Sequence, residues 1–177
     1  MSKIGFFGGC FNPVTNIHIK IANKLIEDKK IDKVIFVPMN DFFKKNDLIE
    51  AMHRYNMLKL ATKDFQKLDV DDIEIKENRK LCAVDAFEII EESHFAEKCC
   101  KRDLFMIMGS DNYEKMPTWK DYNKIKDKYN YIVIERDKSE ISSTQIREMI
   151  RSNDKRVKEY LPKEVYQYII ENELYKL

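Results

Sequence analysis

The first 38 residues alternate between apolar runs and a helical pattern, and this order constrains the fold more than any other feature of the chain. Residues 3–8 form a short apolar run that ends in glycine, and Lys33–Pro38 form a second. Between them, residues 18–29 place apolar side chains at the spacing of a helix. Two apolar strands joined by a helix make a βαβ unit, which implies a parallel sheet.

The same alternation continues to the end of the chain. Strands are predicted over Leu68–Ile75, Asp103–Gly109 and Tyr131–Arg136, and helices over Ala51–Lys63, Ala83–Glu92, Trp119–Lys128, Ser143–Arg151 and Pro162–Glu173. The 177 residues contain no evident linker or repeat, so one domain over residues 1–177 is expected. The predicted fold is α/β: a doubly wound, Rossmann-like parallel sheet of about five strands with C-terminal helices.

Composition excludes several classes of function. The net charge of +1 provides no overall field that would attract nucleic acid or an anionic membrane. No apolar run approaches the roughly 18 to 20 residues that span a bilayer. The four cysteines form no C-x-x-C pair and have no histidine at metal-ligand spacing, so reduced thiols in a cytoplasmic protein and no metal site of its own are expected.

The end of the first predicted strand has the features of an anion site. The Gly8-Gly9 pair lets backbone N–H groups approach a phosphate closely, and Asn12-Pro13 favours a turn before the helix. Thr15 is placed to cap that helix, and His18 lies three residues later on the same face. Taken separately, the glycine pair could simply form a tight turn, and His18 could simply be a surface residue of the helix. Their fixed order between a strand and a helix favours a phosphate site.

In full, residues 8–18 read G-G-C-F-N-P-V-T-N-I-H, which resembles the G-x-F-(D/N)-P-x-(H/T)-x-x-H motif of the HxGH nucleotidyltransferase superfamily. Ile17 stands where many members carry glycine, and it points to the nicotinamide mononucleotide adenylyltransferases. The resemblance implies a site in which Asn12 faces the mononucleotide. It also implies ATP contacts by Gly8, Gly9, Cys10, Phe11, Thr15 and His18.

A second string lies near the other end of the chain. Ser142 or Ser143 can cap a helix, and Arg147 follows about one turn later, so this helix start also suits an anion. A plain serine cap with a surface arginine is the alternative. The string resembles the I-S-S-T-x-I-R motif of the same superfamily, which implies that Ser142, Ser143, Thr144 and Arg147 bind the ATP phosphates.

Three further segments are similar to the mononucleotide adenylyltransferases. The first, V-P-M-N-D-F-F-K-K with a following H-R-Y-N-M, implies that Lys45, or else Lys44, contacts the mononucleotide phosphate; a solvated lysine pair is the alternative. Arg54 is assigned to the mononucleotide as well, although a helix-surface position would also fit.

The remaining two segments follow the strand predicted over Asp103–Gly109. Asp111 resembles the carboxylate that binds a ribose of the nucleotide, and Trp119 the indole that stacks on the pyridine ring, although a lone tryptophan also suits a core. Arg136 is assigned to the ATP side. The loop 79–86 keeps little of the family sequence that reads the pyridine substituent, so the choice between acid and amide stays open.

The resemblance implies an adenylyltransferase of NAD biosynthesis that joins nicotinamide or nicotinate mononucleotide to the AMP moiety of ATP and releases pyrophosphate. His18 and Arg147 are the expected catalytic residues, and Mg²⁺ is expected to arrive with ATP. A homo-oligomer would fit, because related enzymes commonly self-associate. The alternatives are a pantetheine-phosphate adenylyltransferase, a cytidylyltransferase or a non-catalytic nucleotide-sensing domain on the same core.

Overall fold

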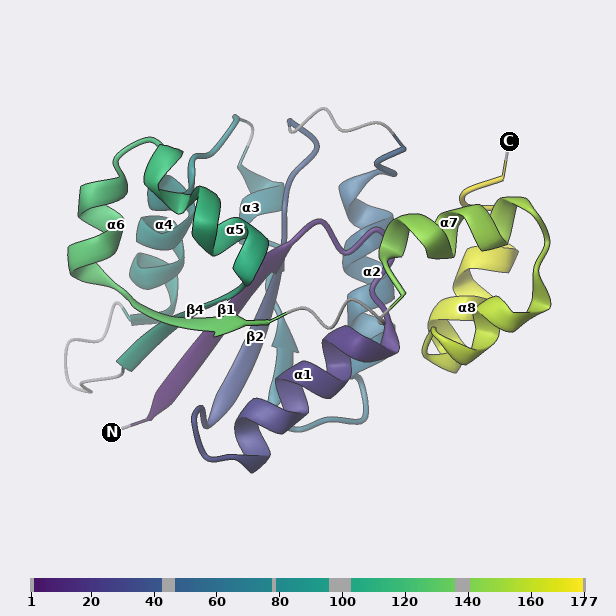
Figure 1. The fold of residues 1–177 in the computed structure, drawn as a ribbon, viewed down its shortest axis with the longest axis horizontal. Coiled ribbons are helices and arrows are strands. Elements are labelled where there is room, and N and C mark those ends of the chain that lie inside the picture. Colours follow the sequence, from purple (N-terminus) through teal and green to yellow (C-terminus); the bar gives the residue numbers. More distant parts are fainter. Residues whose placement is uncertain (1, 43–46, 78, 96–102, 136–140, 177) are drawn as a thin grey trace.

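Five apolar runs of the sequence become the strands of one parallel sheet (Figure 1). The computed structural model describes residues 2–42, 47–77, 79–95, 103–135 and 141–176. The strands are β1 (Lys3–Gly9), β2 (Lys33–Pro38), β3 (Leu68–Val70), β4 (Asp103–Gly109) and β5 (Asn130–Ile134). Their order across the sheet is β3-β2-β1-β4-β5, with every neighbouring pair parallel. This confirms the predicted doubly wound α/β fold.

Helices connect the strands and cover both faces of the sheet. They are α1 (Asn16–Glu27), α2 (Ala51–Thr62), α3 (Ile73–Lys76), α4 (Ala83–Phe95), α5 (Ser110–Lys115), α6 (Tyr122–Lys128), α7 (Ser143–Arg151) and α8 (Lys163–Glu171), with 3₁₀ turns η1 (Met116–Thr118) and η2 (Lys155–Glu159). In Figure 1, α4, α5 and α6 gather at one end of the molecule, and α2, α7 and α8 at the other.

Two hydrophobic cores form because successive side chains of a strand point to opposite faces. In β1, Phe7 packs into the core with α1, α2 and α8, whereas Phe6 packs into the core with α4 and α6. Gly5 lies on the same face of β1 as Phe7, where an added Cβ would be only 2.4 Å from Ile31 Cδ1 and 2.6 Å from Ile107 Cδ1. Glycine therefore lets neighbouring side chains close over the middle of β1.

The strand order also locates the site. The chain moves from β1 outward through β2 to β3, then returns to the other side of β1 to add β4 and β5. The connections consequently diverge at the carboxyl ends of β1 and β4. Open α/β sheets bind ligands in the crevice that forms at such a point.

Several predicted elements differ in their bounds from those observed, and two of these differences lie close to the crevice. The strand predicted over Leu68–Ile75 ends at Val70, because the Asp71 carboxylate accepts the Ile73 N–H at 2.9 Å and the chain turns into the short helix α3. The helix predicted from Trp119 begins at Tyr122, since the Trp119 N–H bonds Met116 O and closes the preceding 3₁₀ turn. Helix α5 and both 3₁₀ turns were not predicted from the sequence.

Candidate active site at the carboxyl ends of β1 and β4

Two adjoining cavities open at the predicted crevice. The first has a volume of about 650 Å³ and lies between the β1–α1 loop, the end of β4 and the start of α7. The second, of about 730 Å³, lies between the same loop, α4 and the segment around Trp119. Residues 8–10 line both, so the glycine-rich loop is a common wall of the two cavities.

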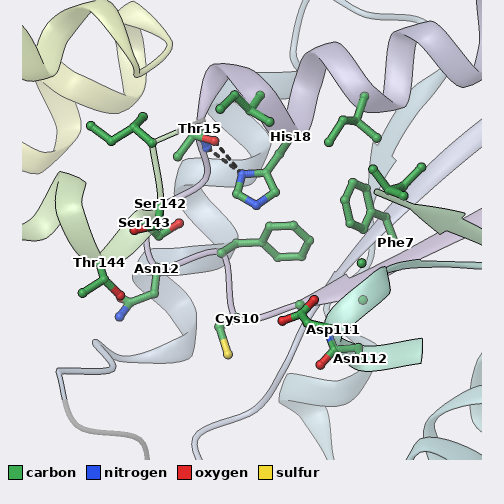
Figure 2. Close-up of a pocket in the computed structure, with 18 of the residues that line it drawn as sticks. Phe7, Cys10, Asn12, Thr15, His18, Asp111, Asn112, Ser142, Ser143 and Thr144 are labelled. Atoms are coloured by element: carbon green, nitrogen blue, oxygen red, sulfur yellow. Dashed lines mark hydrogen bonds between the residues drawn. The ribbon is translucent and has the colours of Figure 1, made fainter. Parts of the chain in front are cut away.

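The sequence-predicted ATP residues come together in the first cavity, although they lie far apart in the chain (Figure 2). Its walls include Gly8, Gly9, Cys10, Phe11, Thr15, His18, Asp111, Ser142, Ser143, Thr144 and Arg147. Asn12, predicted for the mononucleotide, also lines this cavity. Lys44, Lys45 and Arg136 fall outside the described residues.

Backbone conformation shapes the loop. Phe11 has φ of 47°, and its ring covers the loop so closely that a Cβ at Gly9 would be 3.2 Å from Phe11 Cζ. An added Cβ at Gly8 would meet nothing within 4 Å, so the backbone there is open to the cavities. The loop therefore exposes its main chain at Gly8. At position 9, a residue larger than glycine would have to displace the ring of Phe11.

His18 is oriented by the residue that begins its own helix. The Thr15 N–H donates to His18 Nδ1 at 3.0 Å, and Thr15 Oγ1 lies 2.8 Å from the same nitrogen (Figure 2). A ring nitrogen that accepts a backbone N–H carries no proton, so the neutral imidazole carries its proton on Nε2. This ring atom can donate a hydrogen bond to an oxygen in the first cavity. Thr15 itself is buried, and its contacts with Nδ1 orient the imidazole of His18.

The start of α7 is docked onto the turn that precedes α1. Ser142 accepts the Gln145 N–H at 3.2 Å and caps the helix, while Ser143 Oγ donates to Pro13 O at 3.1 Å. Arg147 Nη1 donates to Asn12 O at 2.9 Å. These bonds join the two sequence motifs directly. They aim the first turn of α7, with its available N–H groups, at the first cavity.

Arg54 and Asn12 support the loop from beneath. The structure corrects the helix-surface alternative for Arg54, because its side chain is fully buried. Its guanidinium donates to Cys10 O at 3.0 Å, Ile49 O at 3.0 Å and Asp41 Oδ1 at 2.8 Å. A group enclosed in this way holds the loop in place instead of lying open to a mononucleotide. The structure thus gives Arg54 a supporting role, and its contact with a mononucleotide stays a prediction.

The Asn12 amide is similarly engaged. Its Nδ2 donates to Asp47 O at 2.7 Å, and its Oδ1 accepts the hydroxyl of Tyr175 at 2.9 Å. Burial raises the pKa of Tyr175, which keeps that hydroxyl protonated as the donor. The side chain of Asn12 thus joins the loop to the C-terminal segment. Both ends of its amide are already hydrogen-bonded, although the residue lines the first cavity.

The second cavity contains Trp119 and the divergent loop. Lys80, Leu81, Cys82 and Ala83 form part of its wall together with that indole. Asp85 holds the loop in place, because its carboxylate accepts the Cys82 N–H at 3.0 Å. This hydrogen bond is the main reason that the pKa of Asp85 is lowered. A wall that combines an indole with apolar side chains suits a planar ring.

The lining residues that were not assigned to the site from the sequence include Met39, Glu74 and Asn112. Met39 follows the carboxyl end of β2, and Asn112 lies just beyond that of β4, so strand ends were the signal that could have located both. Glu74 carried no such signal, because it lies in the segment that was predicted to continue as a strand.

Glu74 is the most strongly perturbed carboxyl group near the site. Burial raises its pKa to about 7, against the opposing effects of a hydrogen bond from the Asn40 N–H and of the charge on Arg54. In the folded protein the carboxyl group consequently stays protonated over a pH range in which it ionises in the unfolded chain. Its contribution to stability is complete below about pH 4.5 and is lost as the pH rises through about 7.

We therefore expect Glu74→Gln to change stability in a pH-dependent way. Glutamine keeps the shape and the acceptor for the Asn40 N–H but cannot ionise. The free energy of unfolding of the variant, minus that of the unmodified protein, should therefore increase from pH 5 to pH 8. For such a pKa shift the increase is up to about 3 kcal/mol. Urea unfolding at the two pH values measures the difference. An equal effect of the substitution at both would show that Glu74 does not titrate in this range.

Comparisons with known proteins agree with the geometry. A family model described as cytidylyltransferase-like matches residues 6–149. A protein of Acholeplasma laidlawii named "Probable nicotinate-nucleotide adenylyltransferase" is 34% identical, with 96% of each chain covered. A protein of the same name from Clostridium acetobutylicum is 33% identical, with 99% of this chain and all of the relative covered.

Solved structures share the fold. The nicotinic acid mononucleotide adenylyltransferase of Plasmodium falciparum complexed with NaAD has a TM-score of 0.75 at 21% identity, covering 99% of this chain and 98% of that one. The same enzyme complexed with APC has a TM-score of 0.76 at 22% identity, with the same coverage. Within the described residues, no helix is long and apolar enough to cross a membrane.

Proposed function

Because this chain belongs to the nicotinate-nucleotide adenylyltransferases of the cytidylyltransferase-like family, we propose that it joins a pyridine mononucleotide to the AMP moiety of ATP and releases pyrophosphate. The observation that carries the proposal is the wall formed by residues 8–10, which borders both cavities. ATP occupies the first cavity and the mononucleotide the second. The two phosphates that react then meet at the glycine-rich loop.

The chemistry requires alignment of the phosphates and neutralisation of their charge. The mononucleotide phosphate is already an anion, so it can attack the α-phosphorus without a protein nucleophile or a strong base. His18 donates from Nε2 to the α-phosphate as negative charge develops there, and backbone N–H groups of the loop assist. Cys10 contributes its main chain, and its thiol takes no part in the reaction.

The start of α7 binds the β- and γ-phosphates. Because the Ser143 hydroxyl proton is directed to Pro13 O, this side chain orients the helix and leaves the N–H groups of the first turn for the phosphates. Arg147 retains N–H groups beyond those bonded to Asn12 O and Thr144, and its buried Nε has no partner among the described residues. Its positive charge stabilises the departing pyrophosphate.

Mg²⁺ enters with ATP in this proposal. The carboxylates of the first cavity are those of Asp111 and Glu135, and the described residues contain no group of three or more His, Cys, Asp or Glu side chains that could hold a metal ion. A hard cation held mainly by phosphate oxygens fits such a donor set. Its charge would assist the departure of pyrophosphate. The proposal also includes a cytoplasmic location, supported by Cys10 and Cys82, which form no disulfide within the described residues.

The ring of the mononucleotide is proposed to stack on Trp119. We expect Trp119→Ala to raise KM for the mononucleotide about tenfold or more, since stacking on an aromatic ring contributes roughly 1–3 kcal/mol. KM for ATP should change little, and Trp119→Phe should restore most of the loss. Steady-state kinetics with each substrate varied in turn measures both constants. Equal increases in the two KM values would place Trp119 outside the mononucleotide site.

The choice between acid and amide is testable in the same assay. The relatives carry the name of the nicotinate enzyme, whereas Ile17 points to the nicotinamide branch. A paired measurement of kcat/KM for nicotinate and nicotinamide mononucleotide, each with ATP and Mg²⁺, decides between them. The proposed function requires a pyridine dinucleotide product from at least one substrate, and no product from either would contradict it.

A further inference from the structure

Asn112 holds a position that no other side-chain amide among the described residues shares. In the part of the chain that the structure describes, the two cavities have four lining residues in common: Gly8, Gly9, Cys10 and Asn112. The first three belong to the loop, and Asn112 faces them from the start of α5, beyond the carboxyl end of β4. Figure 2 shows its side chain beside Asp111 and across from Cys10.

The Asn112 side chain is also available to a ligand. It is exposed, and no hydrogen bond of its amide is found within the part of the chain that the structure describes. The amides of Asn12 and Asn40, by contrast, are buried and bonded to main-chain atoms. A polar group that lines both cavities without a structural bond of its own is placed for recognition.

The neighbouring residue provides a contrast in charge. Asp111 lines the first cavity only, where its carboxylate lies so close to the strand end that a Cβ at Gly109 would be 2.7 Å from its Oδ1. The chain thus puts a carboxylate on the ATP side and a neutral amide at the junction. Two anionic phosphates must approach each other at that junction, and a second carboxylate there would repel both.

We propose that the Asn112 amide donates to phosphate oxygen at the junction of the two cavities, and that the reaction requires an uncharged donor at this position. This proposal rests on the proposed function. A mononucleotide phosphate oxygen forms a bond to the α-phosphorus while the bond from that phosphorus to the bridging oxygen breaks, and pyrophosphate leaves with the electron pair. Asn112 transfers no proton and acts by holding the attacking and accepting phosphates together.

The isosteric substitution Asn112→Asp tests the requirement for a neutral group. We expect it to lower kcat/KM for both substrates by about a hundredfold or more, and Asn112→Ala by about tenfold, because aspartate adds repulsion to the loss of a donor. Asn123→Asp, on the exposed surface of α6 and outside both cavities, should leave both constants within about twofold, the scale of an ordinary surface change. A purely structural role for Asn112 would reverse the order, with alanine the more damaging residue.

Binding of ATP alone separates this proposal from the proposed function. Asn112→Asp should weaken ATP about tenfold in calorimetry and leave adenosine unchanged, since only ATP carries phosphate to the junction. If the unmodified protein made no pyridine dinucleotide, the proposed function would fall, and this comparison would still judge Asn112. Wild-type activity in Asn112→Asp, or equal weakening of ATP and adenosine, would overturn the assignment.

Discussion

Replacement of His18 by alanine is expected to lower kcat by about a thousandfold, the upper range for loss of one donor to developing charge. The Thr15 N–H holds Nδ1 and leaves the proton on Nε2, so the imidazole offers a fixed donor in the first cavity. ATP binding should change far less than turnover, because the donor acts mainly as charge develops. Pre-steady-state product formation, together with calorimetric binding of ATP, measures the two effects separately.

Two matched variants sharpen the interpretation of His18. Thr15→Val removes the hydroxyl but keeps the backbone N–H that bonds Nδ1, so it should cost activity moderately. Cys10→Ser should keep substantial activity, because the proposed reaction uses no thiol nucleophile. Near-normal turnover in His18→Ala, with the thermal transition unchanged, would remove His18 from the mechanism. Loss of all activity in Cys10→Ser would indicate covalent catalysis instead.

The second large effect is on stability, at Arg54. Replacement by methionine should lower the free energy of unfolding by about 3 kcal/mol or more, because it leaves two main-chain acceptors around the buried side chain without a donor. The acceptors concerned are Cys10 O and Ile49 O. Arg54→Lys should recover only part of the loss, since an ammonium group cannot reproduce the planar fork of donors. Urea unfolding with a constant m-value measures these differences.

Asp41 supplies the control for Arg54. Its carboxylate is about half exposed and accepts from Arg54 Nη2, and Asp41→Asn keeps an acceptor oxygen at this place, so it should cost less than Arg54→Met. A loss at Asp41 as large as that at Arg54 would assign the stabilisation to the ion pair. A small loss in Arg54→Met would contradict the proposed support of the loop. Because Arg54 bonds Cys10 O, its variants should also lose kcat at temperatures where they remain folded.

Much of the fold could be predicted because local pattern and global architecture agree. Continuous apolar runs such as Lys33–Pro38 read clearly as buried parallel strands, and the observed strand has the same bounds. The prediction that the strand continues after Val70 was wrong, because alternating side chains are also compatible with a turn. The Asp71 carboxylate stabilises that turn. Side-chain bonds to the backbone are not visible in hydrophobic periodicity.

The candidate site was predictable where function requires fixed local order. The residues from Gly8 to His18 form one continuous loop and the start of a helix, so their spacing can be recognised directly in the sequence. Arg54 and Asn112 were harder for different reasons. A buried arginine looks like a surface residue until its packing is known, and Asn112 matters only because two cavities meet beside it. Such roles depend on tertiary contacts between distant segments.

The proposed reaction is a direct transfer between two ligands that meet at residues 8–10. The most direct test incubates the protein with ATP, Mg²⁺ and a pyridine mononucleotide and quantifies dinucleotide and pyrophosphate together. Direct transfer predicts equal amounts of the two products, and no pyrophosphate when the mononucleotide is omitted. Pyrophosphate release from ATP alone, or the absence of dinucleotide with both the acid and the amide substrate, would contradict it.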